Sequence, residues 1–294
     1  MVMAQSLLMR LKQQNPRTQI DVLAPAWVAP LLARMPQVNE VIANPFGHGA
    51  LQLGSRRALG KQLRDKNYSA AYVLPNSLKS ALIPFFAGIP KRIGFKGEAR
   101  YGLINVMHQL DEQKLPLMVE RFAMLAQAPA ETLQRPIERP SLHVTEDMRA
   151  TTLKKFDLNA SKPAIAFCPG AEYGPAKRWP TKHFGELAKK LVAQNYQVWI
   201  VGSAKETPLG AEIQAASGGM CVDLTGKTNL GEVIDLIREK EKVVSNDSGL
   251  MHLAAALDKS TAALFGSTSP GFTPPLSDKA KVISLKLECS PCFK

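Results

Sequence analysis

The sequence predicts an α/β protein built from two doubly wound, parallel-sheet domains. Short apolar segments rich in Val and Ile alternate with helical segments along most of the chain, as in successive strand–helix–strand units. The 294 residues, 45% of them hydrophobic, exceed what one core usually holds, since single cores stop growing at about 250–300 residues. Between residues 127 and 163 the composition shifts to Pro, Thr, Glu and Lys. This shift predicts an interdomain connection.

The first half of the chain predicts a domain of alternating elements. We expect helices at residues 1–13, 27–35, 56–65, 79–87 and 115–126, and strands at 20–25, 38–42, 70–74 and 91–95. Doubly wound domains usually open with a buried strand and a glycine-rich turn that leads into the first helix. This chain starts inside that helix, so we expect the first strand of a Rossmann-like domain, residues 1–140, to be missing.

The second half, residues 141–294, predicts another Rossmann-like domain. We expect strands at residues 164–168, 197–202, 221–224, 242–245 and 261–265, and helices at 181–194, 206–216, 230–239 and 250–257. The two domains are expected to face a common cleft.

Composition excludes several classes of protein. No apolar run approaches the roughly 18–20 residues that span a bilayer, and the N-terminus lacks the pattern of a signal peptide, so we expect a cytoplasmic protein. The nucleotide-binding patterns GxGxxG and GxxxxGK[ST] are absent. Cys289 and Cys292 form one CxxC without a second, and no Asp-x-Asp pair occurs. We therefore expect neither a metal site nor a cofactor.

The segment of residues 242–257 (KVVSNDSGLMHLAAAL) organises the second half. It predicts a strand, a tight turn and a helix capped by Asp247 or Ser248. The N–H groups of the first helical turn favour an anion such as a diphosphate, and Ser248 and Gly249 would supply them. Asp247 could accept hydrogen bonds from sugar hydroxyls, and His252 could add a donor one turn later. An ordinary capped helix with a packed histidine explains the same residues equally well.

Positive charge is concentrated in residues 51–100. Ten Lys and Arg residues stand against Asp65 and Glu98, a net charge of +8 within a formal total of +12. Such a field attracts nucleic acid, anionic lipid or an acidic, phosphorylated substrate. A generally basic, solvated surface is the alternative explanation.

Five segments together resemble a known family. They are residues 71–77 (AYVLPNS), 84–90 (PFFAGIP), 167–180 (FCPGAEYGPAKRWP), 201–206 (VGSAKE) and 246–252 (NDSGLMH). In these segments the chain resembles the ADP-heptose glycosyltransferases of lipopolysaccharide synthesis, which have the two-domain GT-B fold. The resemblance implies an inverting, metal-independent transfer of L-glycero-D-manno-heptose from ADP-heptose to the first heptose of the inner core. Residues 1–140 would bind the acceptor and residues 141–294 the nucleotide sugar.

The resemblance also implies roles for individual residues. On the donor side, Lys177 would place a charge on the diphosphate, and Asp247 would orient the heptose hydroxyls as the second catalytic residue. Glu206 resembles the acid that binds ribose in the family, although a glutamate at a helix start explains it equally well. Thr225, Gly226 and Lys227 would border the adenine.

On the acceptor side, the acidic inner core of lipopolysaccharide would meet basic side chains of residues 51–100 at the surface of the inner membrane. The expected acceptor-binding residues are Arg56, Arg57, Lys79, Arg92 and Arg100. The family is expected to use a carboxylate near the first glycine-rich turn as general base, which would lie upstream of Met1. We therefore expect a chain truncated at both ends.

Three alternatives remain. The chain could bind ADP-sugars without turnover because it lacks the base, or transfer heptose to another core position. A nucleic-acid-binding protein is a third class, but the chain is only 6% aromatic, and its basic stretch lacks interleaved aromatic residues for stacking bases. We therefore expect no nucleic-acid partner.

Overall fold

The computed structural model describes residues 1–47, 49–159, 161–172, 174–239 and 242–292, and it divides them into two compact units. Unit 1 contains residues 1–5, 19–42 and 139–294, and unit 2 contains residues 6–18 and 43–138. The functional division into residues 1–140 and 141–294 stays a prediction.

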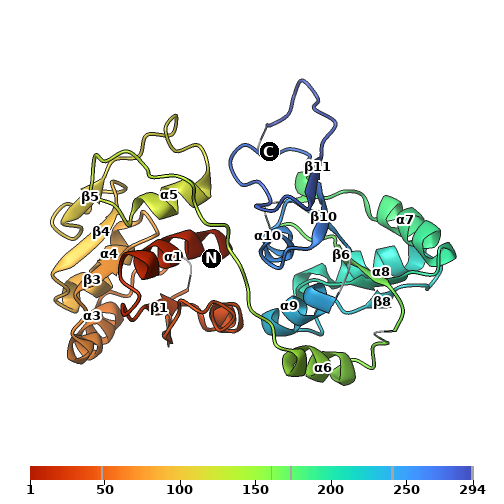
Figure 1. The fold of residues 1–294 in the computed structure, drawn as a ribbon, viewed down its shortest axis with the longest axis horizontal. Helices are drawn as coiled ribbons and strands as arrows, with labels where there is room; N and C mark the ends of the chain where they lie inside the picture. The colour runs from red at the N-terminus through yellow and green to blue at the C-terminus, as the bar shows by residue number, and fades with distance from the viewer. Residues whose placement is uncertain (48, 160, 173, 240–241, 293–294) are drawn as a thin grey trace. The chain divides into compact units, whose positions relative to one another are not determined.

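Unit 1 is built on a parallel sheet, seen on the right of Figure 1. Within the described residues its strands run in the order β11-β10-β9-β6-β7-β8. They are β6 (Ala164–Cys168), β7 (Gln197–Ile200), β8 (Val222–Asp223), β9 (Lys242–Asn246), β10 (Ser260–Leu264) and β11 (Ala280–Ile283). The chain builds outward from β6 through β7 to β8, then returns to place β9 on the other side of β6. This is the order of a doubly wound Rossmann sheet.

Helices connect these strands and cover the sheet. They are α7 (Thr181–Ala193), α8 (Thr207–Ala216), α9 (Leu230–Glu239) and α10 (Gly249–Ala256). Helices α7 and α8 pack together, as do α9 and α10, and Figure 1 shows the two pairs on opposite sides of the sheet. Every residue of β6 is buried, because both faces of a central parallel strand are covered. Phe167 of β6 packs against Phe184 of α7 in this core.

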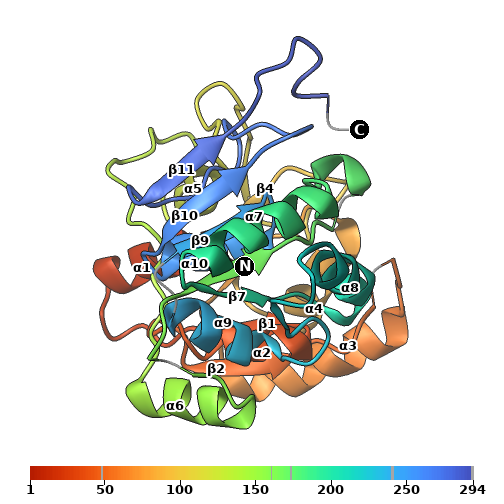
Figure 2. The same cartoon turned by 90° about the vertical axis from the view of Figure 1, so that its right-hand side faces the viewer.

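The remaining elements of unit 1 come from two other parts of the chain. The early segment contributes β1 (Asp21–Ala24), α2 (Ala29–Leu32) and β2 (Glu40–Ala43), and the two strands pair in a small sheet. The later one contributes α6 (Glu146–Lys155), which packs on α9. Figure 2 shows α2, α6 and α9 on one side of the unit. The predicted interdomain connection of residues 127–163 therefore contains a helix.

Unit 2 is an α/β unit around a smaller parallel sheet. Its strands β3 (Ala70–Tyr72), β4 (Lys91–Phe95) and β5 (Val106–His108) pair in this order. Its helices are α1 (Gln5–Gln14), α3 (Leu53–Gln62), α4 (Leu78–Phe86) and α5 (Met118–Met124). Helices α3 and α4 approach closely at Gly60, where an added Cβ would lie 2.6 Å from Cβ of Phe86.

The α/β class and the predicted elements are confirmed, with ends shifted by a few residues. The sequence patterns did not predict β5, α6 or β11. None of the helices within the described ranges has the length and the apolar composition of a membrane-spanning segment.

Candidate functional site

The order of the sheet in unit 1 marks a ligand-binding edge. Strands β6 and β9 are parallel neighbours, and the chain leaves them toward opposite sides of the sheet. In open α/β sheets, ligands bind beyond the carboxyl ends of the strands at such a point. The two segments that leave this edge are residues 169–180 and residues 247–249, both of which the sequence analysis selected.

Lys177 and Asp247 form an ion pair at this edge. Lys177 ends the short 3₁₀-helix η4 (Pro175–Lys177), and Asp247 directly follows β9. Lys177 Nζ lies 2.8 Å from Asp247 Oδ2, and the two side chains are 16% and 7% exposed. A carboxylate this buried needs charged or hydrogen-bonding partners. The structure therefore brings together the two residues predicted to be catalytic, which are seventy positions apart.

Thr268 is a partner of Asp247 that the sequence analysis missed. Its hydroxyl Oγ1 donates to Asp247 Oδ2 over 2.6 Å, and both side chains are buried. Thr268 lies in a Ser/Thr-rich turn after β10, the strand beside β9. The carboxyl ends of neighbouring parallel strands meet at one edge. The available signal was thus the Ser/Thr-rich turn that begins shortly after the predicted strand of residues 261–265.

The amino end of α10 lies next to Asp247. Ser248 is the N-cap residue, and its Oγ lies 3.3 Å from Ser245 Oγ. Gly249 is the first helical residue, and a Cβ built on it would meet nothing within 4 Å. Packing inside the protein therefore does not require a glycine here. Open space next to unpaired helix N–H groups suits the close approach of an anion.

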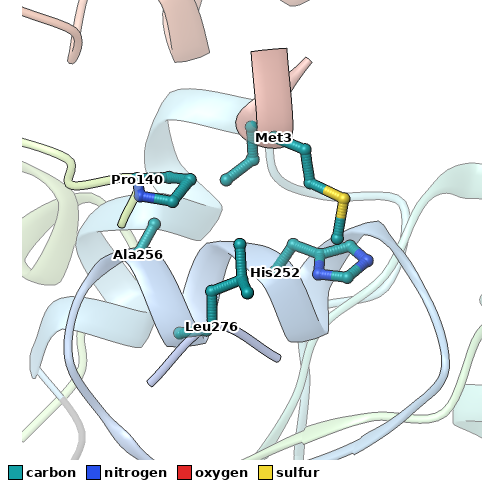
Figure 3. Close-up of a pocket in the computed structure, with 7 residues that line it drawn as sticks. Met3, Pro140, His252, Ala256 and Leu276 are labelled. Atoms are coloured by element: carbon teal, nitrogen blue, oxygen red, sulfur yellow. The ribbon is translucent and has the colours of Figure 1, made fainter. Parts of the chain in front are cut away.

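His252 lies one turn into α10 and lines a small pocket in unit 1, shown in Figure 3. The lining residues are Val2, Met3, Pro140, His252, Ala255, Ala256 and Leu276. Burial lowers the pKa of His252 to about 4, and positive charges nearby, including Lys177, add to this effect, whereas Asp247 opposes it. The imidazole is therefore neutral at physiological pH, with one ring nitrogen as donor and the other as acceptor.

Glu206 lies against the loops that follow β6 and β7. It closes a capping box with Ser203, whose N–H donates to Glu206 Oε2 over 2.5 Å. A Cβ built on Gly170 would lie 1.4 Å from Glu206 Oε1, and one on Gly202 would lie 2.7 Å from Oε2. Both glycines thus make room for this carboxylate. The negative charge of Glu206, together with complete burial as the larger cause, raises the pKa of the Cys168 thiol.

Thr225, Gly226 and Lys227 follow β8, farther along the same edge. Thr225 is buried, and its hydroxyl donates to Asp223 Oδ1 over 2.7 Å. Gly226 has a φ of +71°, and its N–H donates to the carbonyl of Gly202 over 3.0 Å. Lys227 Nζ donates to the carbonyl of Asp223 over 2.7 Å. These bonds hold the segment in a fixed turn beside the loop after β7.

Three of the predicted acceptor-binding arginines hold main-chain carbonyls in unit 2. Arg56 donates to the carbonyls of Leu51 and Ala50, and its guanidinium lies 4.2 Å from the centre of the Phe46 ring. Burial lowers the pKa of Arg56 and also that of Arg100, the latter despite the charge of Glu98.

The other two arginines are similarly engaged. Arg100 is 1% exposed and donates to the carbonyls of Pro75 and Phe95, at 2.6 and 2.5 Å. Arg92 donates to three carbonyls, those of Ile89, Gly102 and Leu103. The donors of these arginines are directed at the protein itself.

The two remaining basic candidates are more accessible. Arg57 is exposed on α3, and Lys79 is half-buried near the start of α4. Across the described ranges, no group of three or more His, Cys, Asp and Glu side chains is arranged to hold a metal ion. Cys289 and Cys292 are exposed free thiols.

Comparison with known proteins places this chain in a family. Residues 56–294 match the model of glycosyltransferase family 9 (heptosyltransferase). The chain is 52% identical to lipopolysaccharide heptosyltransferase 2 of Escherichia coli K12, over 97% of this chain and 84% of that protein. It is 51% identical to lipooligosaccharide heptosyltransferase 2 of Haemophilus influenzae, over 97% of this chain and 85% of that protein.

A solved structure agrees with these relatives. The fold is similar to that of E. coli ADP-heptose lipopolysaccharide heptosyltransferase II, with a TM-score of 0.92 and 47% identity. The match covers 100% of this chain and 92% of the other. The predicted GT-B architecture is thereby confirmed, and the chain belongs to glycosyltransferase family 9, the heptosyltransferases.

Proposed function

We propose that this glycosyltransferase moves L-glycero-D-manno-heptose from ADP-heptose to the first heptose of the lipopolysaccharide inner core, with inversion and without a metal. The observation that carries the proposal is the Lys177–Asp247 ion pair beside the amino end of α10. The similarity to lipopolysaccharide heptosyltransferase 2 and to ADP-heptose lipopolysaccharide heptosyltransferase II supports the donor and the class of acceptor.

The donor diphosphate would bind across the edge formed by β6 and β9. Departure of ADP from the anomeric carbon adds negative charge to the diphosphate. The ammonium of Lys177 and the N–H groups of Ser248 and Gly249 would stabilise this charge without rearranging, because the fold already positions them. These groups would supply the positive charge that a metal supplies in other transferases.

The other parts of ADP-heptose would be bound by residues at the same edge of the sheet. The carboxylate of Asp247, held on Oδ2 by Lys177 and Thr268, would accept hydrogen bonds from heptose hydroxyls. Glu206 would accept from ribose hydroxyls. The turn of Thr225, Gly226 and Lys227 would border the adenine. Neutral His252 would contribute a hydrogen bond rather than a charge.

For the acceptor we propose Arg57 and Lys79 as the first contacts. Arg56, Arg92 and Arg100 would support them by fixing the loops of unit 2 through the carbonyl contacts described above. We also propose a cytoplasmic location, with peripheral contact between basic side chains and the inner membrane, where anionic headgroups attract lysine and arginine.

Calorimetry with ADP and ADP-heptose tests the donor site. Lys177→Ala removes a charge-assisted contact to phosphate, worth about 1.5–3 kcal/mol, so ADP affinity should fall about 10- to 100-fold. Lys279→Ala is the matched control, since Lys279 pairs with Asp258 on the exposed surface. Unchanged ADP affinity in Lys177→Ala would remove Lys177 from the site.

A second variant distinguishes contacts to the heptose from contacts to ADP. Asp247→Asn should reduce the preference for ADP-heptose over ADP more than it reduces affinity for ADP, because Asp247 is assigned to the sugar. Equal losses for both ligands would mean that Asp247 only supports the turn before α10.

A further inference from the structure

Asn246, the last residue of β9, joins two parts of the site through its side-chain amide. The side chain is completely buried. Its Nδ2 donates to the carbonyl of Pro169 over 2.7 Å, and its Oδ1 accepts from the N–H of Trp179 over 3.1 Å. One side chain thus satisfies a donor and an acceptor of the main chain more than sixty positions earlier in the sequence.

The two bonded residues lie at the ends of the loop that carries Lys177. Pro169 follows β6 directly, and Trp179 stands just before α7. Between them, the N–H of Arg178 donates to the carbonyl of Pro175 over 2.9 Å, which closes the turn that presents Lys177. Asn246 therefore hydrogen-bonds both ends of this loop to the end of β9, and Asp247 is the next residue in the chain.

We propose that Asn246 is a positioning residue that holds Lys177 at the diphosphate. This inference rests on the proposed function. The amide sets the spacing between the Lys177 loop and the end of β9, and through it the 2.8 Å separation of Lys177 Nζ and Asp247 Oδ2. In an active site, a misplacement of about 1 Å can cost on the order of a hundredfold in rate.

The chemistry of the two bonds explains why an amide stands here. An aspartate could accept from Trp179 but could not donate to the carbonyl of Pro169 while ionised, and a leucine of similar size could do neither. A buried main-chain group that loses its partner is driven to move toward another partner or water. The loop, and Lys177 with it, would shift.

A residue with a purely structural role provides the control. Gln214 of α8 makes the same kind of double contact in the same unit: its Nε2 donates to the carbonyl of Cys221 over 2.8 Å, and its Oε1 accepts from the N–H of Cys221 over 3.1 Å. Gln214 Nε2 also donates to the carbonyl of Gly219 over 3.3 Å. Asn246→Leu and Gln214→Leu therefore both remove side-chain bonds to main-chain groups, but only Asn246 joins the Lys177 loop to β9.

The test is a double-mutant cycle on the full chain. Initial rates with ADP-heptose and a heptose-primed inner-core acceptor give kcat and KM for Asn246→Leu, Lys177→Ala and the double variant, and calorimetry gives ADP affinity. We expect Asn246→Leu to raise KM for ADP-heptose and to weaken ADP binding by about tenfold or more. When Lys177 is already alanine, Asn246→Leu should change KM for ADP-heptose and ADP affinity by less than about threefold. The reason is that Asn246 is expected to act on binding through the position of Lys177. Gln214→Leu should lower the melting temperature while leaving KM within about twofold.

Two results would overturn the inference: full additivity of the Asn246 and Lys177 losses, or an equal rise in KM for Gln214→Leu. If the leucine variant does not fold, Asn246→Ala takes its place in the cycle, since the smaller side chain leaves room for water at the two main-chain groups. Failure of the unaltered chain to bind ADP would refute the proposed function and the inference together. The unaltered chain could bind ADP normally, and Lys177→Ala could weaken that binding, while the Asn246 and Lys177 losses are simply additive. This combination would refute the inference and leave the proposed function standing.

Discussion

Lys177 and Asp247 form a charged pair that contacts within the protein alone hold in place. The carboxylate is 7% exposed and receives Lys177 Nζ and the Thr268 hydroxyl on the same oxygen. The local strand–turn–helix motif indicated Asp247, and the family resemblance of residues 167–180 indicated Lys177. The sequence did not identify Thr268 or Asn246, since their contacts depend on which strands become neighbours.

Gly170→Ala tests whether the position of Glu206 matters for binding. The added methyl would overlap the carboxylate of Glu206, whose flexible side chain can turn away. We therefore expect a small loss of stability, about 1 kcal/mol or less, and a fall in ADP affinity of about tenfold because the ribose contact is displaced. Calorimetry and thermal unfolding measure the two effects.

A second glycine variant is Gly249→Ala, where the added Cβ meets open space in the protein. It should leave the melting temperature near that of the unaltered chain and weaken ADP binding by crowding the diphosphate. An ADP affinity unchanged by Gly170→Ala would exclude Glu206 from the ribose site.

The pKa of His252 predicts a specific dependence of stability on pH. Its pKa is about 4 in the folded protein and 6.5 ordinarily, so between these values the unfolded chain binds a proton that the folded chain does not. Stability from this residue is therefore complete above pH 6.5 and is lost as pH falls toward 4, by at most about 3 kcal/mol.

His252→Gln keeps a polar side chain that does not titrate. We expect the free energy of unfolding of the two proteins to diverge from pH 6.5 down to pH 4, with the histidine protein losing more. A constant difference across this range, measured by urea denaturation, would mean that His252 titrates equally in both states.

At the scale of elements, the sequence predicted those with an apolar pattern and missed those without one. Helix α6 (EDMRATTLKK) has only three apolar residues, Met148, Ala150 and Leu153, and they form no continuous apolar stripe that would predict a helix. Its N-cap Thr145 accepts from the N–H of Met148, and Thr152 hydrogen-bonds Asp235. Strand β5 has three residues, and β11 lies exposed at the sheet edge. Tertiary contacts define these elements.

A buried ion pair holds the early segment of the chain onto unit 1. Arg34, just after α2, lies 2.8 Å from Asp235 of α9, and their side chains are 9% and 4% exposed. Thr152 of α6 donates to the other carboxylate oxygen over 2.8 Å. Burial raises the pKa of Asp235, whereas Thr152 and Arg34 oppose this effect. Three elements therefore meet at one carboxylate.

Arg34→Leu should strongly destabilise unit 1, because it leaves Asp235 buried without its cation. Loss of one partner of a buried pair costs about 3–5 kcal/mol. The double variant Arg34→Leu with Asp235→Leu should recover much of this loss, since no unpaired charge remains. Chemical unfolding measures both. A cost below about 1 kcal/mol for the single variant, the range of an exposed pair, would contradict this role.

At the scale of the whole molecule, pattern and composition predicted two α/β units, but they give no signal that the chain passes between the compact units more than once. Residues 1–5 and 19–42 belong to unit 1 although they precede nearly all of unit 2. Gln5 shows why: its side chain donates to the carbonyl of Ser141 and accepts from the N–H of Ser141, at 2.7 and 2.9 Å. Contacts across 136 positions leave no local signal in a sequence.

The basic residues of unit 2 illustrate the same limit. The net charge of +8 in residues 51–100 was readable from the sequence. The sequence did not show which arginines bond to main-chain carbonyls and which face solvent, because this depends on the folded positions of the loop carbonyls. Arg100 is fully enclosed, whereas Arg57 faces solvent.

The most direct test of heptose transfer is the intact mass of a heptose-primed inner-core acceptor after incubation with this chain and ADP-heptose. We expect the acceptor to gain the mass of one heptose and ADP to appear in equal amount, with the same yield in the presence of a metal chelator. Lys177→Ala should slow the gain, and Lys279→Ala should not. An acceptor of unchanged mass, or ADP released without a matching mass gain, would contradict the assignment.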